Sequence, residues 1–510
     1  MTVTPSVIDD MLRATAADHP EAEALGERGA AIDFATLDAR VHRIANGLLA
    51  EGKAGDRVAI LGRNTDAQVE LMFGILRARQ VVLPVNWRLV PAEIAYILQH
   101  SGATRLFCDA AFLPAAELAC AGHAIPITVL DHNFARWRDA QSNEPVARGG
   151  RADEVALQMY TSGTTGLPKG VMLTNANVVA SVAIYSRPPL DLAPGDVIYA
   201  PAPMFHITGI GPVLRMAQSG ARLVVSAAFA ADEAVQVMAR ERVSYTTLAP
   251  AMIQACLAAP SFAGADLSAL RVIAYGGAPI AETVLREATA RIGCRFVQCY
   301  GLTETTGPIT ILSPDDHAPG RDLLLSCGRA AGDIAIRIVD VQGCDVPPGD
   351  TGEIIVGGAI TMAGYAADPD ATAATIRDGW LYTGDAGYLN ADGYLFIRDR
   401  VKDMIVSGGE NIYPVEVENA LLEHGGVADA AVIGVPDDRW GEAVLALVVA
   451  APGAGEDTQA ILDFCRTRIA GYKCPKSIRF TDAVPRNAAG KILRREIREP
   501  FWKGRERLVG

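Results

Sequence analysis

Short β-rich runs alternate with helical stretches along most of this chain, and that alternation limits the possible folds more than any other feature. It begins near Asp56 with strand-like runs at 57–61 and 81–85, separated by an amphipathic helical stretch at 67–78. It resumes at residue 196 and continues to residue 301. Strands separated by helices of this length are typical of βαβ units on parallel sheets. The sequence therefore predicts an α/β fold with two βα-type sheets.

The pattern changes beyond Gly328. Strand-like runs are joined there by glycine and aspartate, and the Asp392-Gly393 pair is typical of a β-hairpin turn, which predicts a small antiparallel β subdomain. Beyond Arg400, helical and strand-like runs precede a basic tail and predict a compact α+β unit of about one hundred residues. We expect an N-terminal domain over residues 1–400 and a small mobile C-terminal domain over residues 401–510.

Composition narrows the functional class. A chain of 510 residues with 50% hydrophobic residues can fill more than one core, and its formal net charge of -13 gives no positive field for nucleic acid or an anionic membrane. The N-terminus lacks the pattern of a signal peptide, and no apolar run reaches the ~18 residues of a membrane span. The nine cysteines form no CxxC pair. We expect a cytoplasmic protein that acts on small molecules.

A loop rich in small and hydroxylated residues, YTSGTTGLPKG at 160–170, has the composition of an anion-binding site. Glycines allow several backbone N–H groups to point inward, hydroxyls add further donors, and a single lysine supplies a mobile positive charge suited to phosphate. The residues concerned are Thr161, Ser162, Gly163, Thr164, Thr165, Gly166 and Lys169. Lys169 is followed by Gly170 and a β-like run, so the spacing disfavours a P-loop NTPase and predicts a separate kind of phosphate loop.

Four further motifs follow this loop: YGLTET (300–305), YTGD (382–385), RDRVKDMIVSGGENIYP (398–414) and PRNAAGKILR (485–494). Together they resemble, in order and over almost the whole chain, the acyl-CoA synthetases of the adenylate-forming superfamily, which include fatty-acyl, 4-chlorobenzoyl and 4-coumaroyl-CoA ligases. The resemblance implies a ligase that uses ATP and Mg²⁺ to form an acyl-adenylate and pyrophosphate. The acyl group then passes to coenzyme A, with release of AMP.

The resemblance also implies roles for individual residues. Lys491 would stabilise charge between the carboxylate and the α-phosphate, Glu304 would hold Mg²⁺, and Thr303 would contact phosphate. His206 stands at an aromatic position that acts as a gate in many relatives, and amino-acid-activating relatives carry an aspartate there. Its identity therefore disfavours a peptide-synthetase adenylation domain. The adenine and ribose would be bound by Gly276, Gly277, Ala278, Tyr300, Asp385 and Arg400.

A change of domain orientation is implied as well. Lys402 stands at the hinge position of the family, where rotation would bring the GGEN stretch, Gly408, Gly409, Glu410 and Asn411, to the pantetheine channel of coenzyme A. The acyl pocket, carried over by motif position, would be formed by Ile207, Thr208, Gly209, Gly277, Cys299, Gly301, Thr306, Gly307 and Pro308. This wall is uncharged, which disfavours malonate-like diacids and favours a medium- or long-chain fatty acid or an aryl or alicyclic acid.

Two other activities use the same adenylation machinery. An acyl-AMP ligase would load a carrier protein and need little affinity for coenzyme A, whereas a luciferase-like oxidase would use oxygen and show no dependence on coenzyme A. The sequence leaves both open beside the coenzyme A ligase. It predicts no nucleic-acid partner and no membrane span, and it is compatible with a homodimer.

Overall fold

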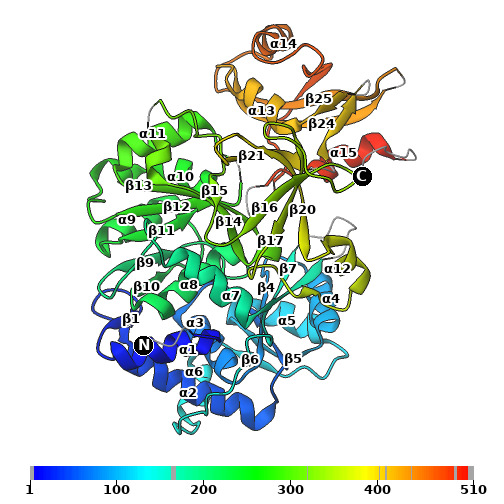
Figure 1. Ribbon diagram of the computed structural model, residues 1–510. Coiled ribbons are helices and arrows are strands. Elements are labelled where there is room, and N and C mark those ends of the chain that lie inside the picture. Colours follow the sequence, from blue (N-terminus) through cyan, green and yellow to red (C-terminus); the bar gives the residue numbers. More distant parts are fainter. Residues whose placement is uncertain are drawn as a thin grey trace.

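The protein is a mixed α/β structure, as the sequence predicts (Figure 1). The computed structural model describes residues 5–161, 168–278, 280–318, 320–400, 403–407, 410–437, 439–486 and 491–503, without the side chains of residues 399, 400, 410 and 411. Among these residues, no helix combines the length and apolar character needed to cross a bilayer.

A seven-stranded sheet is formed largely by the first third of the chain, in the order β18-β8-β7-β4-β3-β5-β6. Its strands are β3 (Arg57–Leu61), β4 (Val81–Val85), β5 (Ala103–Cys108), β6 (Ile127–Val129), β7 (Val155–Thr161), β8 (Lys169–Thr174) and β18 (Gly364–Tyr365). Its helices are α3 (Asp66–Arg77), α4 (Pro91–Ser101), α5 (Leu113–Cys120) and α6 (His132–Asp139). The strands from β7 to β6 pair in parallel, which confirms the first predicted βα-type sheet, whereas β8 and β18 pair antiparallel at one edge.

The second βα-type sheet has nine strands in the order β15-β14-β13-β12-β11-β9-β10-β1-β2. They are β1 (Glu23–Leu25), β2 (Ile32–Asp33), β9 (Val197–Ala200), β10 (Arg222–Val225), β11 (Tyr245–Leu248), β12 (Val272–Gly276), β13 (Arg295–Leu302), β14 (Gly307–Leu312) and β15 (Arg329–Ala330). Its helices are α7 (Asn175–Tyr185), α8 (Ile207–Ser219), α9 (Ala231–Arg240), α10 (Pro250–Leu257) and α11 (Glu282–Ile292). The strands from β13 to β1 are parallel.

A smaller antiparallel sheet confirms the predicted β subdomain. It contains β16 (Ala335–Val339), β17 (Gly352–Gly357), β19 (Ile376–Arg377), β20 (Trp380–Leu389) and β21 (Leu395–Arg400), with α12 (Pro369–Thr375) beside it. β20 and β21 form a hairpin around the Asp392-Gly393 turn, where Gly393 has a φ of 79°. This positive φ explains the glycine at the turn.

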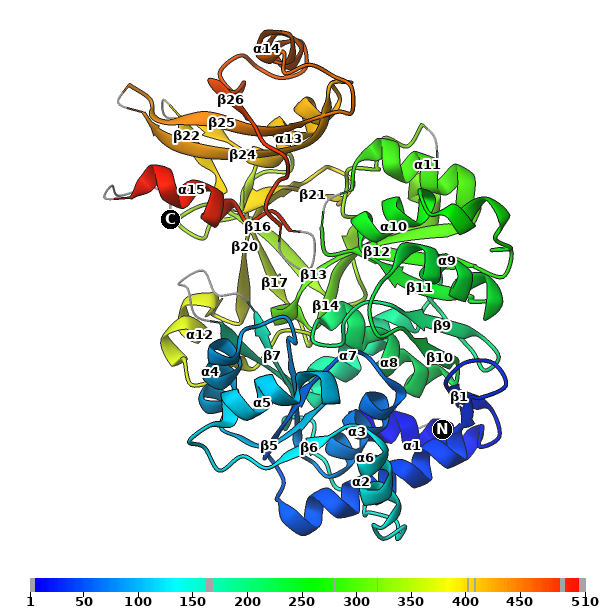
Figure 2. The ribbon, with the colours of Figure 1, turned by 180° about the vertical axis from the view of Figure 1, so that it is seen from behind.

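The C-terminal part is an α+β unit (Figure 2). Its sheet contains β22 (Ile405–Ser407), β23 (Glu410–Ile412), β24 (Val427–Asp437), β25 (Gly441–Ala450) and β26 (Ser477–Phe480). Its helices are α13 (Pro414–Leu422), α14 (Thr458–Arg466) and α15 (Arg494–Trp502). α13 and α15 both pack on β24, and two hydrophobic clusters lie wholly between residues 405 and 501. This unit therefore has cores of its own.

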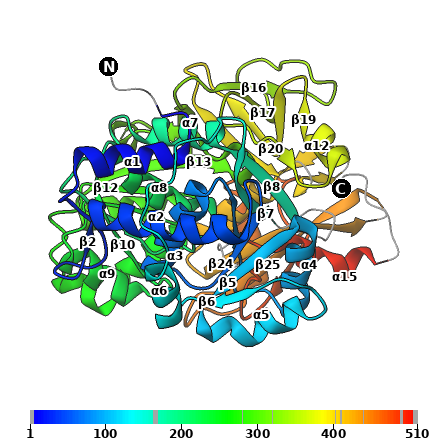
Figure 3. The same cartoon turned by 90° about the horizontal axis from the view of Figure 1, so that it is seen from below.

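The two βα-type sheets share one large core. A single hydrophobic cluster contains Val82 and Leu157 of the first sheet together with Ile198 and Val297 of the second. α1 (Ile8–Asp18) contacts α2 (Phe34–Glu51), α3, α7 and α8, and Figure 3 shows α1 and α2 lying across this region. The N-terminal helices thus connect the two sheets.

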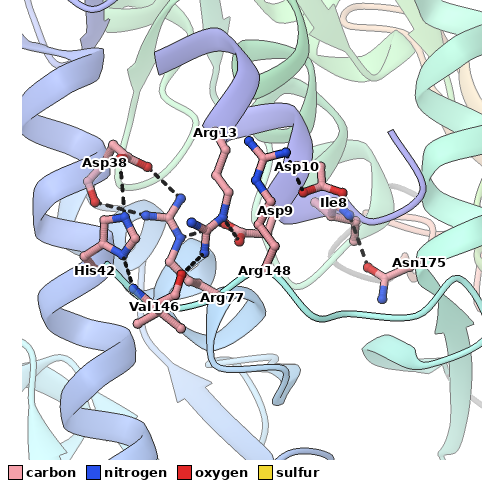
Figure 4. A network of polar contacts seen from close by, with 10 residues as sticks. All are labelled: Ile8, Asp9, Asp10, Arg13, Asp38, His42, Arg77, Val146, Arg148 and Asn175. Atoms are coloured by element: carbon pink, nitrogen blue, oxygen red, sulfur yellow. Dashed lines mark hydrogen bonds and ion pairs between the residues drawn. The ribbon is translucent and has the colours of Figure 1, made fainter. Parts of the chain in front are cut away.

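A buried arginine forms polar contacts that link these N-terminal helices (Figure 4). The Arg77 side chain on α3 is fully buried; its Nε donates to Asp9 Oδ1 on α1 at 2.8 Å, and its Nη1 donates to the carbonyl oxygen of Asp38 on α2 at 3.1 Å. Nη2 lies 2.7 Å from Asp38 Oδ1. Asp38 also lies 3.6 Å from His42 Nε2, and the His42 Nδ1 atom accepts from the backbone of Val146. Arg77 therefore holds three helices around two carboxylates.

Candidate active site

Two residues predicted to bind the ATP phosphates and the metal both contact Tyr365. Lys169 begins β8, directly opposite Thr161 on β7, and its Nζ lies 4.9 Å from the centroid of the Tyr365 ring. The Tyr365 hydroxyl donates to Glu304 Oε1 at 3.0 Å. A cation over an aromatic ring is attracted by its π face, so Tyr365 orients both a positive and a negative group. Tyr365 lies in no recognised motif and was not among the predicted site residues.

Backbone hydrogen bonds hold this cluster together. Met362 N donates to the carbonyl oxygen of Glu304 at 2.9 Å, and Ala366 N donates to that of Gly170 at 2.7 Å. β18, which contains Tyr365, pairs antiparallel with β8. The segment from 362 to 366 thus connects the loop that contains Glu304 to the strand that begins with Lys169.

The YGLTET and YTGD motifs meet at a second point. The Tyr300 hydroxyl on β13 donates to Asp385 Oδ2 on β20 at 2.7 Å. Asp385 is buried, and its backbone N–H donates to Thr383 Oγ1 at 3.0 Å. The backbone of Asp385 is also the cross-strand partner of Arg400. An aromatic ring beside a fixed carboxylate suits a base and the hydroxyls of a ribose.

The turn after β13 is held in an unusual backbone conformation. Thr306 has a φ of 58°, a region that β-branched residues seldom adopt. Its Oγ1 donates to the carbonyl oxygen of Ile360 at 2.7 Å, and its own carbonyl oxygen accepts from Ser181 Oγ at 2.8 Å. Strain of this kind persists where surrounding contacts enforce it and is frequent at functional sites. These contacts fix the loop that contains Glu304.

Three glycines predicted to contact nucleotide or acid are required by the packing of the backbone itself. A Cβ on Gly301 would lie 1.9 Å from the carbonyl oxygen of Gly307, and one on Gly276 would lie 2.1 Å from that of Cys299. A Cβ on Gly209 would lie 2.1 Å from the carbonyl oxygen of Pro203. The absence of a Cβ at these glycines therefore allows neighbouring backbone segments to approach closely, whether or not the glycines also contact a ligand. Gly277, with a φ of 81°, and Ala278 continue from β12 toward this region.

We expect Gly301→Ala to lower the free energy of unfolding by about 3 kcal/mol, because backbone atoms must move to admit the methyl group. Gly264→Ala is the matched control, since a Cβ there would meet no atom within 4 Å. Urea unfolding monitored by tryptophan fluorescence compares the two variants. If both variants lose equally little free energy of unfolding, the backbones of β13 and β14 can move apart at little cost, contrary to this prediction.

His206 lies at the start of α8, where the predicted gate was placed. Its Nε2 is buried and has no hydrogen-bond partner among the described residues. Burial, followed by the positive charges of Arg88 and Lys491, lowers the pKa of His206 to about 4. The imidazole is therefore neutral near pH 7. The influence of Lys491 also places its ammonium within electrostatic reach of His206, although the two residues are far apart in sequence.

We expect Lys491→Gln to raise the pKa of His206, because it removes one of the cations that oppose protonation. NMR titration of the imidazole, assigned with a His206→Asn variant, measures the shift. Lys476→Gln changes an exposed lysine of the same C-terminal unit and serves as the control. Equal titration midpoints of the His206 imidazole in the wild type, Lys491→Gln and Lys476→Gln would contradict a position of Lys491 near His206.

The same pKa predicts a pH dependence of stability. The pKa of His206 is lower in the folded protein than its usual value of 6.5. Between pH 6.5 and about 4 the unfolded chain therefore binds a proton at His206 that the folded protein does not. The stability contributed by neutral His206 is present above pH 6.5 and is lost as the pH falls toward 4. Urea unfolding across this range should show a smaller pH dependence for His206→Asn.

The structure brings together some of the residues predicted to form the acyl wall. Cys299 lies on β13 opposite Ile311 on β14, and burial raises the pKa of the Cys299 thiol to about 12, so it is uncharged. Ile207 on α8 is half-buried, whereas Thr208 next to it is exposed. Pro308 is buried in β14, and Gly307 lies close to Ser181 and Tyr185 at the end of α7. α7 was absent from the predicted pocket.

Several predicted residues lie outside the described part of the chain. These are Ser162, Gly163, Thr164, Thr165 and Gly166 of the phosphate loop, Lys402 of the hinge, and Gly408 and Gly409 of the coenzyme A channel. Arg400, Glu410 and Asn411 belong to described strands, but their side chains are not described. Thr303 lies with Glu304 in a short 3₁₀ helix, Thr303–Thr305.

The described residues contain no group of three or more His, Cys, Asp or Glu side chains arranged to hold a metal ion. Glu304 is therefore the carboxylate in the described cluster that could meet a cation. Mg²⁺ is commonly bound by one or two carboxylates, with phosphate oxygens and water completing its shell. The site thus fits a magnesium ion that arrives with a nucleotide.

Comparison with known proteins agrees with this geometry. Residues 12–366 match the model for AMP-binding enzymes, and residues 416–491 match that for the AMP-binding enzyme C-terminal domain. A fatty acid–acyl-carrier-protein ligase, ScoC of Streptomyces coeruleorubidus, is 40% identical over 94% of each chain. A feruloyl-CoA synthase from Amycolatopsis is 40% identical over 94% of this chain and 96% of the relative.

A solved structure shows the same fold. O-succinylbenzoate coenzyme A synthetase (MenE) of Bacillus subtilis, in complex with ATP and a magnesium ion, superimposes with a TM-score of 0.84. The two proteins are 30% identical, and the match covers 95% of this chain and 98% of the other. The similarity therefore extends over both the large and the small parts of the molecule.

Proposed function

Because this chain belongs to the family of AMP-binding enzymes, we propose that it is an ATP- and magnesium-dependent acid:coenzyme A ligase. It forms an acyl-adenylate and pyrophosphate, then an acyl-CoA thioester and AMP. The observation that carries the proposal is the convergence of Lys169, Tyr365 and Glu304 beside the Tyr300–Asp385 pair. The first group suits phosphates and the second suits a nucleoside.

Nucleotide binding begins with these two clusters. Lys169, Thr161 and the rest of the 161–169 loop would contact the β- and γ-phosphates. Glu304 would hold the metal, and Thr303 would contact a phosphate oxygen. Bound Mg²⁺ supplies positive charge that offsets the phosphates. Asp385 accepts from the ribose hydroxyls, and Tyr300 stacks on adenine. Gly276, Gly277 and Ala278 line the other face of the base, and Arg400 completes the ribose site.

The adenylation step requires a carboxylate oxygen to attack the α-phosphorus. Both groups are negative, so fixed positive charge beside the reacting atoms lowers the barrier. Lys491 provides that charge, a role supported by its electrostatic influence on His206. Neutral His206 contacts the acid without adding a charge at the pocket entrance. The new bond joins the carboxylate oxygen to phosphorus, and pyrophosphate leaves.

The second step moves the acyl group to sulfur. The thiolate of coenzyme A attacks the acyl carbon, and AMP departs with the former carboxylate oxygen. We propose that the domain of residues 401–510 rotates about Lys402 between the two steps, which brings the Gly408–Asn411 stretch to the pantetheine channel. The separate hydrophobic cores of the C-terminal unit support rotation as a body.

The acid is a medium- or long-chain fatty acid or an aryl or alicyclic acid with an uncharged tail, which suits the neutral Cys299 thiol and the other apolar positions of the wall. The similarity to ScoC favours a second candidate, transfer to a carrier protein.

We further infer a cytoplasmic location, which agrees with nine unpaired cysteines. A homodimer stays a prediction that analytical ultracentrifugation can test.

The proposed function is tested by incubating the protein with ATP, Mg²⁺ and a panel of fatty, benzoic, cinnamic and alicyclic acids. Mass spectrometry should detect AMP and acyl-CoA in equal amounts for at least one class of acid. Parallel reactions with a phosphopantetheine-bearing carrier protein separate the two acceptors. Faster transfer to the carrier than to coenzyme A would favour the second candidate, and absence of AMP with every acid would contradict both.

A further inference from the structure

A buried arginine lies behind the predicted acyl wall. Arg215 is on α8, only 3% exposed, and its Nη2 donates to the carbonyl oxygens of Tyr185 and Leu190. Its guanidinium carbon lies 4.0 Å from the centroid of the Tyr245 ring and 5.4 Å from that of Tyr185. Its Nη1 is buried with no hydrogen-bond partner among the described residues, and Arg215 forms no ion pair with any of them.

An unpaired donor in this position is energetically unfavourable. A buried polar group that loses water without gaining a partner costs about 1–3 kcal/mol, and more when it is charged. Two carbonyl oxygens, two aromatic faces and a hydrogen bond with the Tyr245 side chain already stabilise part of the Arg215 charge. What is missing is one acceptor for Nη1.

The same face of α8 borders open space. Ile207, Gly211 and Arg215 are spaced four residues apart and therefore lie on one side of the helix. A Cβ on Gly211 would meet no atom within 4 Å, although the residues around it on α8 are largely buried. The space over Gly211 thus lies between Ile207, at the pocket entrance beside His206, and Arg215.

The other boundaries of this space are predicted pocket residues. Burial raises the pKa of the Cys299 thiol, and the charge of Arg215 opposes this shift. Burial also raises the pKa of Tyr185; Cys299 adds to that shift and Arg215 opposes it. A Cβ on Gly307 would lie 3.8 Å from Tyr185 Cε2. Arg215 therefore lies near these predicted pocket residues, more than two helical turns along α8 from His206.

We propose that Arg215 determines specificity by donating a hydrogen bond from Nη1 to an oxygen atom at the far end of the acid. This inference rests on the proposed acid:coenzyme A ligase activity. Eight residues of helix separate Ile207 from Arg215, roughly 12 Å at 1.5 Å per residue, and the arginine side chain leans back over part of that length. The favoured acid therefore has an extended tail that ends in a carbonyl or hydroxyl oxygen or, in departure from the uncharged tail proposed above, in a carboxylate oxygen. Malonates are too short to reach.

The test compares acids matched in length. Straight-chain acids from hexanoic to dodecanoic are assayed as methyl-ended, keto-ended and dicarboxylic forms, by pyrophosphate release with ATP and Mg²⁺. We expect kcat/KM at the optimal length to be about tenfold to a hundredfold higher for an oxygen-ended acid than for its methyl-ended counterpart. The keto and dicarboxylic arms show whether the preferred oxygen is neutral or charged. Equal use of all three forms at every length would overturn the inference.

Two variants provide independent checks. Arg215→Met keeps a long side chain against Tyr245 and should remove the preference for an oxygen-ended acid while methyl-ended acids are still adenylated. Gly211→Leu leaves Arg215 in place, fills the open space and should lower kcat/KM for the longer acids more than for hexanoate. Retention of the preference in Arg215→Met, or an equal effect of Gly211→Leu at all lengths, would contradict the proposal. Failure of the wild type to adenylate any acid would instead contradict the proposed function.

Discussion

Replacing Lys491 by alanine should lower the rate of pyrophosphate release by about a hundredfold to a thousandfold, while leaving thioester formation from synthetic acyl-adenylate close to the wild-type rate. A preorganised charge at the reacting oxygen typically contributes an effect of this size. Lys491 is exposed, but its charge lowers the pKa of His206, which supports the proposed position of its ammonium near the entrance of the predicted acyl pocket. Its contribution therefore belongs to the first half-reaction.

Lys476→Ala is the matched control, because Lys476 is an exposed lysine of the same C-terminal unit. Both half-reactions should proceed normally in that variant. Lys491→Arg should recover little of the lost rate, since a planar guanidinium does not reproduce a compact ammonium. Equal loss of both half-reactions in Lys491→Ala would contradict the assigned role and point to a folding defect or a shared function.

Replacing Arg77 by methionine should lower the free energy of unfolding by about 3–5 kcal/mol, because the carboxylate of Asp38 loses its buried arginine partner and that of Asp9, which also pairs with Arg13, loses one of two arginine partners. Arg77 is fully buried and contacts both groups within 3 Å. Urea unfolding, with the fluorescence of Trp137 on the neighbouring α6 as a probe, measures the change. Since the network connects α1, α2 and α3, we also expect faster proteolysis near the N-terminus.

Arg151→Met is the control for this effect. Arg151 pairs with Asp153, but both side chains are more than two-thirds exposed. Exposed ion pairs contribute about 0–1 kcal/mol, so this variant should unfold near the wild-type midpoint. Similar losses in the two variants would show that burial of the Arg77 network adds no special stability.

Local patterns predicted the elements of this fold well. The run RVAIL coincides with β3 and VVLPV with β4, because short apolar runs between polar turns have few other conformations available. The Asp392-Gly393 pair forms the expected hairpin. The pairing of β1 and β2 with the second sheet was not predicted, because it joins residues 23–33 to strands about two hundred residues later.

The candidate site shows the same contrast between what local sequence predicts and what long-range packing determines. Motifs identified Lys169, Glu304, Tyr300 and Asp385, and the structure brings them together in two clusters. Tyr365 and Arg215 were missed because their importance arises from packing. Tyr365 belongs to the edge strand β18, and Arg215 on α8 is buried against Tyr185 of α7 and Tyr245 of β11. In sequence, an arginine in a helix is usually a solvent-facing residue.

The proposed activation of the acid begins with attack of its own carboxylate oxygen on the α-phosphorus of ATP. The direct measurement uses an acid that turns over in the panel, labelled with ¹⁸O in its carboxylate, together with ATP, Mg²⁺ and coenzyme A. Mass spectrometry should find one ¹⁸O atom transferred to AMP, because AMP leaves with the former carboxylate oxygen when the thiol attacks. Label in inorganic phosphate, or unlabelled AMP beside the acyl-CoA product, would contradict an acyl-adenylate intermediate.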